Sequence, residues 1–404
     1  TQYSPVRARE CLEEALGIFE GEGMLAERAD ALAGLVRAVL ATDPDDAERV
    51  ARLALDAATA AADPRLRAGA LTQIGQLALH REDALAAIES LTEATALAEE
   101  IGDMATLGRA QLMSGHAHAL TGELESADRY FDAAMDTAER TGAQMAWLYG
   151  AMARVEHWEG RQRFARILEW LEGILPELTA RGHRHHLSYV HYAMGYRALR
   201  WLGLPAEALE HLDVAAELTR GDDWNPPAVM FRNGRAALLL DLGRTPDARA
   251  AIDEARRIAE EHRLQEATMH YLLVTEARVA LTEGDLERAG NDIARLDGIC
   301  RDRGEGHAAS ALNAELALEA GDPSAAIEAA RRAVGLEPLI GVNRWFSRLQ
   351  VLELLARAEV AAGEDPSATL ATARGEAEAR LAEIPDRYRA GFLSRPEVQA
   401  VLSG

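Results

Sequence analysis

Cysteine and basic residues are scarce in this sequence. Only two cysteines occur, Cys11 and Cys300, and they lie far apart along the chain. They lack the close spacing of zinc ligands and are typical of a reduced, cytosolic environment. Lysine and arginine together number 43 against 66 aspartates and glutamates, which gives a net charge of −23. A surface this acidic repels phosphate backbones, so we expect no nucleic-acid partner.

Long apolar runs, strand patterns and catalytic motifs are also missing. No run of about 18 or more apolar residues occurs, and no signal-peptide pattern opens the chain, so we expect no membrane span and a cytoplasmic location. β-branched residues do not alternate with polar ones as they would in strands. There is no Walker A motif, dinucleotide-binding glycine series, nucleophile elbow or His-Glu-x-x-His motif. The sequence therefore predicts an all-α protein that is not an enzyme and holds no cofactor or metal.

What the sequence has in abundance is a repeat of about 40 residues, built mainly from helix-forming residues. A turn position of the same kind recurs once in each repeat, and seven of the eight turn positions are glycine. Glycine adopts the left-handed backbone that ends many helices. The turn positions are Glu82, Gly122, Gly160, Gly203, Gly243, Gly284, Gly321 and Gly363. They indicate a helical hairpin that recurs along the chain.

Small residues recur at two fixed places around each turn. The residue seven positions before the turn is small in every repeat but one, which has Tyr196. Small side chains on both helices let the helices of a hairpin cross closely. Five positions after the turn, all eight residues are alanine: Ala87, Ala127, Ala165, Ala208, Ala248, Ala289, Ala326 and Ala368. The large residue at Tyr196 leaves two registers open in that repeat, one residue apart.

The full series of small, turn and apolar positions resembles the tetratricopeptide repeat. It is complete in Gly115, Gly122, Ala127, Phe131 and Ala134. The long repeats are similar to the superhelical sensor domains of large bacterial transcription activators and of signalling ATPases. The resemblance implies a right-handed superhelical solenoid of about nine helix-turn-helix repeats with a C-terminal capping helix.

The ends of the chain depart from the repeat. Residues 1–23 have the spacing of a second helix with no first helix before it, which suggests a cut repeat and favours the C-terminal region of a longer protein. Residues 24–380 form the expected repeat array. Residues 381–404 break the pattern and are expected to cap the last hydrophobic face.

Four of the twelve histidines cluster in one stretch of the sequence: His183, His185, His186 and His191. Imidazole ligates zinc and titrates near neutral pH, so a metal-binding or pH-sensing site is one interpretation. No carboxylate or thiolate accompanies the histidines at the junction. The favoured interpretation is therefore a solvated loop that leads into a helix.

The site that we expect is the concave groove, which the first helix of each hairpin lines. The resemblance implies that residues about thirteen, ten, six and three positions before the turn face it. Residues six positions before the turn are Gln76, His116, Arg154, Arg197, Ala237, Arg278, Glu315 and Arg357. The predicted groove residues are Arg109, His116, Trp147, Arg154, His157, Tyr189, Tyr192, Arg197, Arg200, Met230, Asn233, Tyr271 and Arg278. If the register slips by one residue, Tyr189, Tyr192 and Tyr196 replace Arg197 on the groove face.

Arginine and aromatic residues are typical of interface hot spots, and arginine binds carboxylates through two hydrogen bonds. Of the 20 aromatic residues, 11 lie between positions 147 and 231. The alternative interpretation is a structural role for these arginine and aromatic residues. Aromatic residues at helical spacing often form the core, and exposed arginines often pair with glutamates of the next repeat.

The leading hypothesis is a non-catalytic solenoid that binds a peptide, a protein or a small anionic ligand in its groove. The resemblance implies the sensor or scaffold region of a cytosolic bacterial signalling ATPase or transcription regulator, with oligomerisation through an attached ATPase region. The alternative is a stand-alone adaptor that bridges two partners. An enzyme ranks last, because only His116, His157 and the 183–191 histidines could supply its chemistry.

Overall fold

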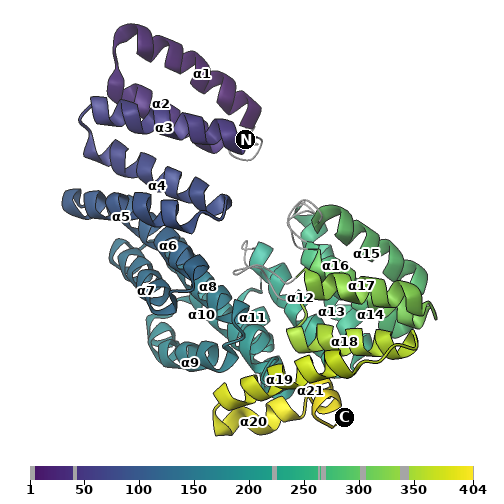
Figure 1. Ribbon diagram of the computed structural model, residues 1–404. Coiled ribbons are helices and arrows are strands. Elements are labelled where there is room, and N and C mark those ends of the chain that lie inside the picture. The colour runs from purple at the N-terminus through teal and green to yellow at the C-terminus, as the bar shows by residue number, and fades with distance from the viewer. Residues whose placement is uncertain are drawn as a thin grey trace. The chain divides into compact units, whose positions relative to one another are not determined.

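The computed structural model describes residues 5–39, 43–220, 225–262, 264, 270–300, 306–336 and 345–403. Within these ranges the chain forms 21 α-helices and one π-helix, and no β-strand (Figure 1). This confirms the all-α helical-repeat fold expected from the sequence. The chain divides into two compact units, Thr1–His157 (unit 1) and Trp158–Gly404 (unit 2).

Unit 1 begins with a lone helix and continues as helical hairpins. Its helices are α1 (Pro5–Glu22), α2 (Leu25–Val39), α3 (Pro44–Ala60), α4 (Pro64–His80), α5 (Ala84–Ile101), α6 (Met104–Thr121), α7 (Leu124–Thr141) and α8 (Gln144–Gly160), the last of which runs across the boundary between the units. Aspartates start several of them: the Asp63 and Asp83 carboxylates accept hydrogen bonds from backbone amides in the first turns of α4 and α5. These caps pair amides that have no partner inside the helix.

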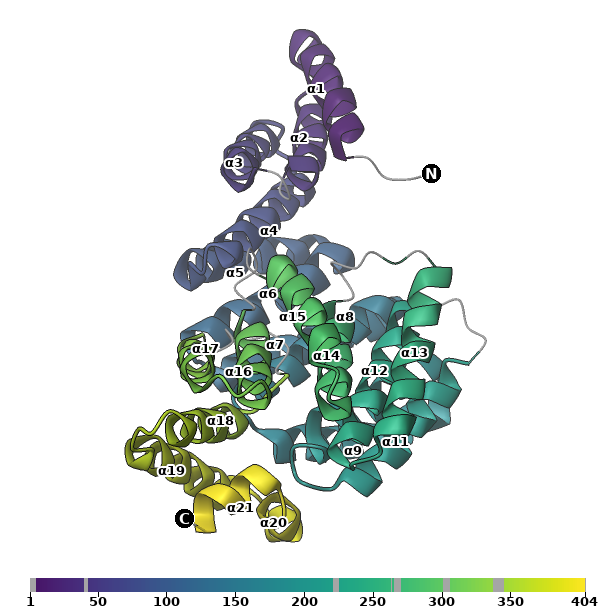
Figure 2. The same cartoon turned by 90° about the vertical axis from the view of Figure 1, so that its right-hand side faces the viewer.

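Unit 2 continues the same hairpin pattern as far as α19 (Ser367–Glu383). Its helices are α9 (Phe164–Arg181), α10 (Arg184–Tyr192), the π-helix η1 (Ala193–Leu199), α11 (Pro205–Leu218), α12 (Asn225–Asp241), α13 (Thr245–Glu261), α14 (His270–Glu283), α15 (Leu286–Cys300), α16 (His307–Glu319), α17 (Pro323–Gly335), α18 (Arg348–Ala361), α19 (Ser367–Glu383), α20 (Asp386–Leu393) and α21 (Pro396–Ser403). Figure 2 shows the hairpins α12–α13, α14–α15 and α16–α17 in succession. In chain order, the described helices from α2 to α19 pair as nine hairpins.

Seven of the eight predicted turn positions have the left-handed backbone that ends the first helix of a hairpin. Gly160 does not: it is the last residue of α8, and the left-handed residue is Gln162, with φ 57°. The reason is the packing of α9. Near its start α9 buries Phe164 and Ile167 rather than Ala165, so the turn comes two residues later.

The close helix crossings predicted from the small residues before the turns are present at Gly75 and Gly115. A methyl group added to Gly75 would overlap the side chain of Leu91, and one added to Gly115 would overlap the ring of Phe131. Six of the eight predicted alanines are fully buried, whereas Ala165 is only partly buried and Ala368 is exposed. In α19 the connection before the helix is longer, so Ala373 occupies the buried position instead.

The repeat that contains Tyr196 uses the shifted register. The π-helix η1 inserts an extra residue, so the small residue at the crossing is Gly195. A Cβ atom on Gly195 would lie 2.6 Å from the carbonyl oxygen of Ala208 in α11. The bulge thus restores the close crossing that the sequence spacing interrupts.

The C-terminal segment of unit 2 folds back onto the beginning of the same unit. Arg380 donates to the carbonyl oxygen of Arg161 at 3.1 Å. Arg387 Nη2 lies 3.2 Å from Glu172 Oε2 in α9. Phe392 in α20 is 2% exposed, so the segment buries an apolar residue as well as forming ion pairs. Unit 2 is therefore an array of hairpins whose two ends touch.

Candidate functional site

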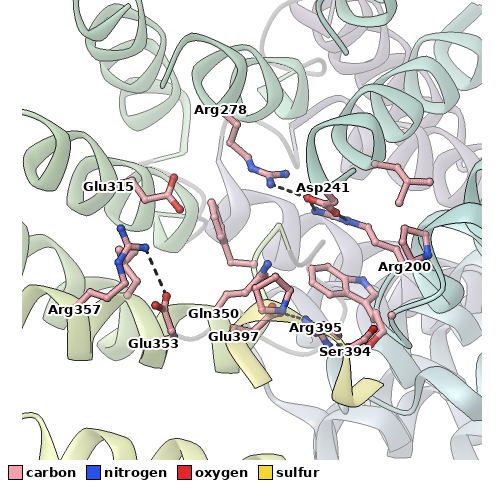
Figure 3. A pocket seen from close by; sticks show the side chains of 17 residues that line it. Arg200, Asp241, Arg278, Glu315, Gln350, Glu353, Arg357, Ser394, Arg395 and Glu397 are labelled. Carbon is pink, nitrogen blue, oxygen red and sulfur yellow. Dashed lines mark hydrogen bonds and ion pairs between the residues drawn. The ribbon is translucent and has the colours of Figure 1, made fainter. Parts of the chain in front are cut away.

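Unit 2 contains a cavity of about 520 Å³. The first helices of four consecutive hairpins line it (α12, α14, α16 and α18), together with the end of η1 and the segment between α20 and α21. Figure 3 shows the polar side chains that point into it. Eight of the lining residues carry charge, four of each sign: Arg200, Arg278, Arg357, Arg395, Asp241, Glu315, Glu353 and Glu397.

Two arginines share one carboxylate on one side of the cavity. Asp241, the last residue of α12, accepts a hydrogen bond from Arg200 Nε at 2.5 Å and one from Arg278 Nη2 at 2.9 Å. Burial alone would raise the pKa of Asp241, but the two guanidinium groups lower it to about 2. The guanidinium of Arg200 also lies 4.6 Å from the ring centroid of Trp201. The carboxylate therefore stays ionised and fixes the position of both arginines.

The opposite side of the cavity holds Glu315, Glu353 and Arg357. Arg357 Nη1 lies 3.6 Å from Glu353 Oε2, a long ion pair between neighbouring turns of α18. Glu315 in α16 makes no hydrogen bond or ion pair with any residue that the structure describes. Burial raises the pKa of Glu315, and the charges of Arg278 and Arg357 counteract part of that rise. Burial also raises the pKa of Glu353.

The C-terminal segment supplies one wall. Arg395 is 7% exposed; its Nη1 donates to the carbonyl oxygen of Trp201 at 2.9 Å, and its Nη2 donates to Ser347 Oγ at 3.2 Å. The same guanidinium forms an ion pair with Glu397. Burial lowers the pKa of Arg395, and the carboxylate of Glu397 offsets part of that effect. The cavity is thus complete only while the end of the chain is docked.

Arg200 and Arg278 are the predicted groove residues that meet in this cavity. The others in unit 2 pack elsewhere. Tyr189, Tyr192, Arg197 and Asn233 are buried, and Met230 and Tyr271 are partly buried.

Aromatic contacts account for part of that burial. The ring centroid of Tyr192 lies 5.5 Å from that of Tyr196 and 4.9 Å from that of Phe231. Arg197 forms a buried ion pair with Glu159. Tyr271 stacks on Trp345 at 6.3 Å. These contacts explain why the shifted tyrosines do not line the cavity: their rings fill the core between helices.

The remaining predicted residues belong to unit 1. Trp147 and His157 are buried, and Arg154 is buried in an ion pair with Asp132. His116 is partly buried, with its ring centroid 5.4 Å from that of Phe131. Arg109 is exposed on α6.

The histidine cluster forms two ring pairs. His183 stacks on His186 with centroids 5.0 Å apart, and His191 Nδ1 lies 2.9 Å from His211 Nδ1 in α11. Burial, with a smaller contribution from the charge of His211, lowers the pKa of His191 to about 4. In the ranges that the structure describes, no three residues of His, Cys, Asp or Glu are grouped so that they could hold a metal ion.

Sequence reasoning identified two of the eight charged residues of the cavity, Arg200 and Arg278, and missed the other six. Glu315 and Arg357 occupy the same position relative to the turn as Arg278, so that column of the repeat contained the signal for them. Glu353 lies ten positions before its turn, another groove position. Arg395 and Glu397 follow no repeat register, since they come from the segment after the array. Only the fold shows that they line the cavity.

The fold is similar to solved helical-repeat proteins. The apo form of the quorum sensor NprR from B. thuringiensis matches with a TM-score of 0.53 and 14% identity, over 82% of this chain and 98% of that chain. A Rap protein complexed with competence and sporulation factor matches with a TM-score of 0.50 and 14% identity, over 82% and 96%. At this identity the likeness establishes the tetratricopeptide-like fold and nothing more.

No protein-family model matches the chain, and no curated protein sequence matches it. Among the helices of the described ranges, none combines the length and apolar character needed to span a bilayer.

Proposed function

We propose that this chain is a non-catalytic binding protein and that the cavity of unit 2 holds a short peptide segment. The observation that carries the proposal is the convergence of eight charged side chains from six parts of unit 2 on one cavity. Its volume, about 520 Å³, falls within the range of ordinary ligand sites. In the similar structures, one protein is a quorum sensor and the other is complexed with competence and sporulation factor, which supports a binding role for the same fold here.

The charge of the cavity favours a peptide over a small anion. Four arginines face four carboxylates, so the cavity has no excess of positive charge to hold an isolated anion. A peptide offers hydrogen-bond donors and acceptors along its length, and it can match charges of both signs.

The proposal extends to the cellular role that the sequence resemblance implies. In that role the chain is the sensor region of a cytosolic regulator, and ligand binding changes how an attached ATPase or transcription-activating region oligomerises. The alternative is an adaptor that holds two different proteins at once. Light scattering of the full-length regulator with and without the bound peptide separates these roles, because only the sensor role changes the mass of the assembly.

The test of peptide binding is selection from a displayed library of random nonapeptides, followed by calorimetry with the enriched sequences. Arg357→Ala removes a cavity side chain whose own ion pair is long, so the protein should fold. We expect this variant to bind the enriched peptides about tenfold more weakly or worse.

Arg257→Ala is the matched control. Arg257 lies on the second helix α13 and, like Arg357, forms an ion pair with a glutamate one helical turn away. Its peptide affinity should stay within about twofold of the original. The proposal fails if no peptide is enriched, or if both variants bind as the original protein does.

A further inference from the structure

We propose that the cavity of unit 2 recognises a zwitterion: an ammonium group that binds Glu315, and a carboxylate that binds Arg357. The inference rests on the proposed function, because it names the chemistry of the ligand in the same cavity. It follows from how the charged side chains of the cavity are paired (Figure 3).

The first observation is that the arginines around Asp241 outnumber the carboxylates there. Asp241 accepts hydrogen bonds from both Arg200 and Arg278, so two positive charges share one carboxylate. Arg395 and Glu397 form a pair of their own. Contacts within the cavity therefore leave one positive charge without a carboxylate of its own.

The second observation is a carboxylate without a contact partner. Glu315 is the one charged residue of the cavity lining that forms no ion pair within the described ranges. In Figure 3 its carboxylate points into the cavity, which Arg278 and Arg357 also line. Neither guanidinium forms an ion pair with it, although both act on its charge from a distance. A carboxylate placed in this way can accept hydrogen bonds from a group that enters the cavity.

The third observation is that Arg357 is available to a ligand. Its side chain is 51% exposed, and its distance of 3.6 Å to Glu353 is the longest of the ion pairs in the cavity. By contrast, Arg200 is 3% exposed and fixed between Asp241 and Trp201. Arg357 is therefore the arginine that can turn towards an incoming carboxylate.

A ligand with charges of both signs fits this arrangement better than an ion of either sign. A cation at Glu315 would bring an uncompensated positive charge close to Arg278 and Arg357. An anion at Arg357 would place a second negative charge close to Glu315. A zwitterion adds no net charge: its ammonium gives Glu315 a positive partner, and its carboxylate gives Arg357 a partner beside the distant Glu353. Free amino acids and short peptides with free ends both have this chemistry, and both are within the volume of the cavity.

The probes are free amino acids and tripeptides whose side chains carry no charge, so that only the ends are charged. Each tripeptide is offered with free ends, with an acetylated amino end, with an amidated carboxyl end, and with both ends blocked. Equilibrium dialysis against the full chain, with mass-spectrometric detection, measures the bound fraction of every form. We expect free ends to bind at least tenfold more tightly than either blocked form. The amino acids and the tripeptides distinguish the two sources of the zwitterion.

Two variants assign each end of the ligand. Glu315→Gln keeps the shape of the side chain. This variant should bind the tripeptide with free ends and the tripeptide with an acetylated amino end equally weakly. It should still bind the tripeptide with an amidated carboxyl end more weakly than the one with free ends. Arg357→Ala should instead bind tripeptides with a free carboxyl end and tripeptides with an amidated one with equal affinity. Glu287→Gln removes an exposed carboxylate from α15 and should bind as the original protein does.

The outcomes separate this inference from the proposed function. Blocked and free ends that bind equally, or a Glu315→Gln variant that still prefers free ends, would overturn the zwitterion. If nonapeptides still bind and depend on Arg357, the peptide-binding proposal stands without it. If neither nonapeptides nor these small probes bind, both proposals fail.

Discussion

Gly203 and Gly391 lie backbone to backbone where the end of unit 2 meets its beginning. A methyl group on Gly203 would overlap the carbonyl oxygen of Gly391, and Gly203 also has a left-handed backbone with φ 74°. The contact joins the turn after η1 to helix α20.

Gly203→Ala should weaken the docking of the C-terminal segment. Gly243→Ala is the matched control, because Gly243 has a similar φ of 69° and no atom near the added methyl group. Both variants incur the cost of a left-handed alanine, about 1 to 2 kcal/mol. The overlap adds about 1 to 3 kcal/mol for Gly203→Ala alone. Urea unfolding measures the difference, and limited proteolysis should show faster cleavage after residue 380 in that variant. Equal stability of the two variants would contradict the close contact.

Gly115→Ala should destabilise unit 1, although alanine is the better helix former. The added methyl group would overlap the ring of Phe131, which is fully buried. We expect a loss of about 1 to 3 kcal/mol from overpacking. Gly69→Ala, on α4 with nothing near the added methyl group, should instead gain up to about 1 kcal/mol. Chemical unfolding of both variants checks the signs, and a stabilised Gly115→Ala protein would refute the crossing.

Arg197→Met should lower stability because it removes the guanidinium that pairs with the buried carboxylate of Glu159. The two side chains are 4% and 1% exposed. Breaking such a pair costs about 3 to 5 kcal/mol. The double variant Arg197→Met, Glu159→Leu should recover most of that loss, which a double-mutant cycle measures. Arg181→Ala, at an exposed pair with Glu177, should cost less than about 1 kcal/mol. If Arg197→Met costs no more than Arg181→Ala, the pair does not stabilise the core.

His116 should make the protein less stable in acid. Burial lowers the pKa of His116 to about 4. The unfolded chain takes up a proton near pH 6.5 and the folded chain only near pH 4, so stability falls as the pH drops through that interval. His116→Gln should therefore lose about 2 kcal/mol less unfolding free energy between pH 7 and pH 5 than the original protein. His80→Gln, at an exposed position of unit 1, is the control. Parallel pH profiles of the original protein and His116→Gln would contradict the lowered pKa.

The helical repeat and most of its turns could be predicted from the sequence alone. Local chemistry sets these features: glycine takes the left-handed backbone at Gly122 or Gly243, and the glycine at Gly115 marks a close helix crossing whatever the rest of the chain does. The groove positions of the repeat also pointed to Arg200 and Arg278, and the same columns contain Glu315, Glu353 and Arg357.

Tertiary structure decided the rest. The turn at Gln162 follows the packing of Phe164 and Ile167, and the π-helix shifts the register so that Gly195 meets Ala208. The cavity depends on the return of Arg395 to Trp201, a contact between residues almost two hundred positions apart. Repeat spacing describes one hairpin at a time, so it cannot specify where the end of an array docks. Burial, likewise, is a property of all the helices together, and it determined which arginines became core ion pairs and which face the cavity.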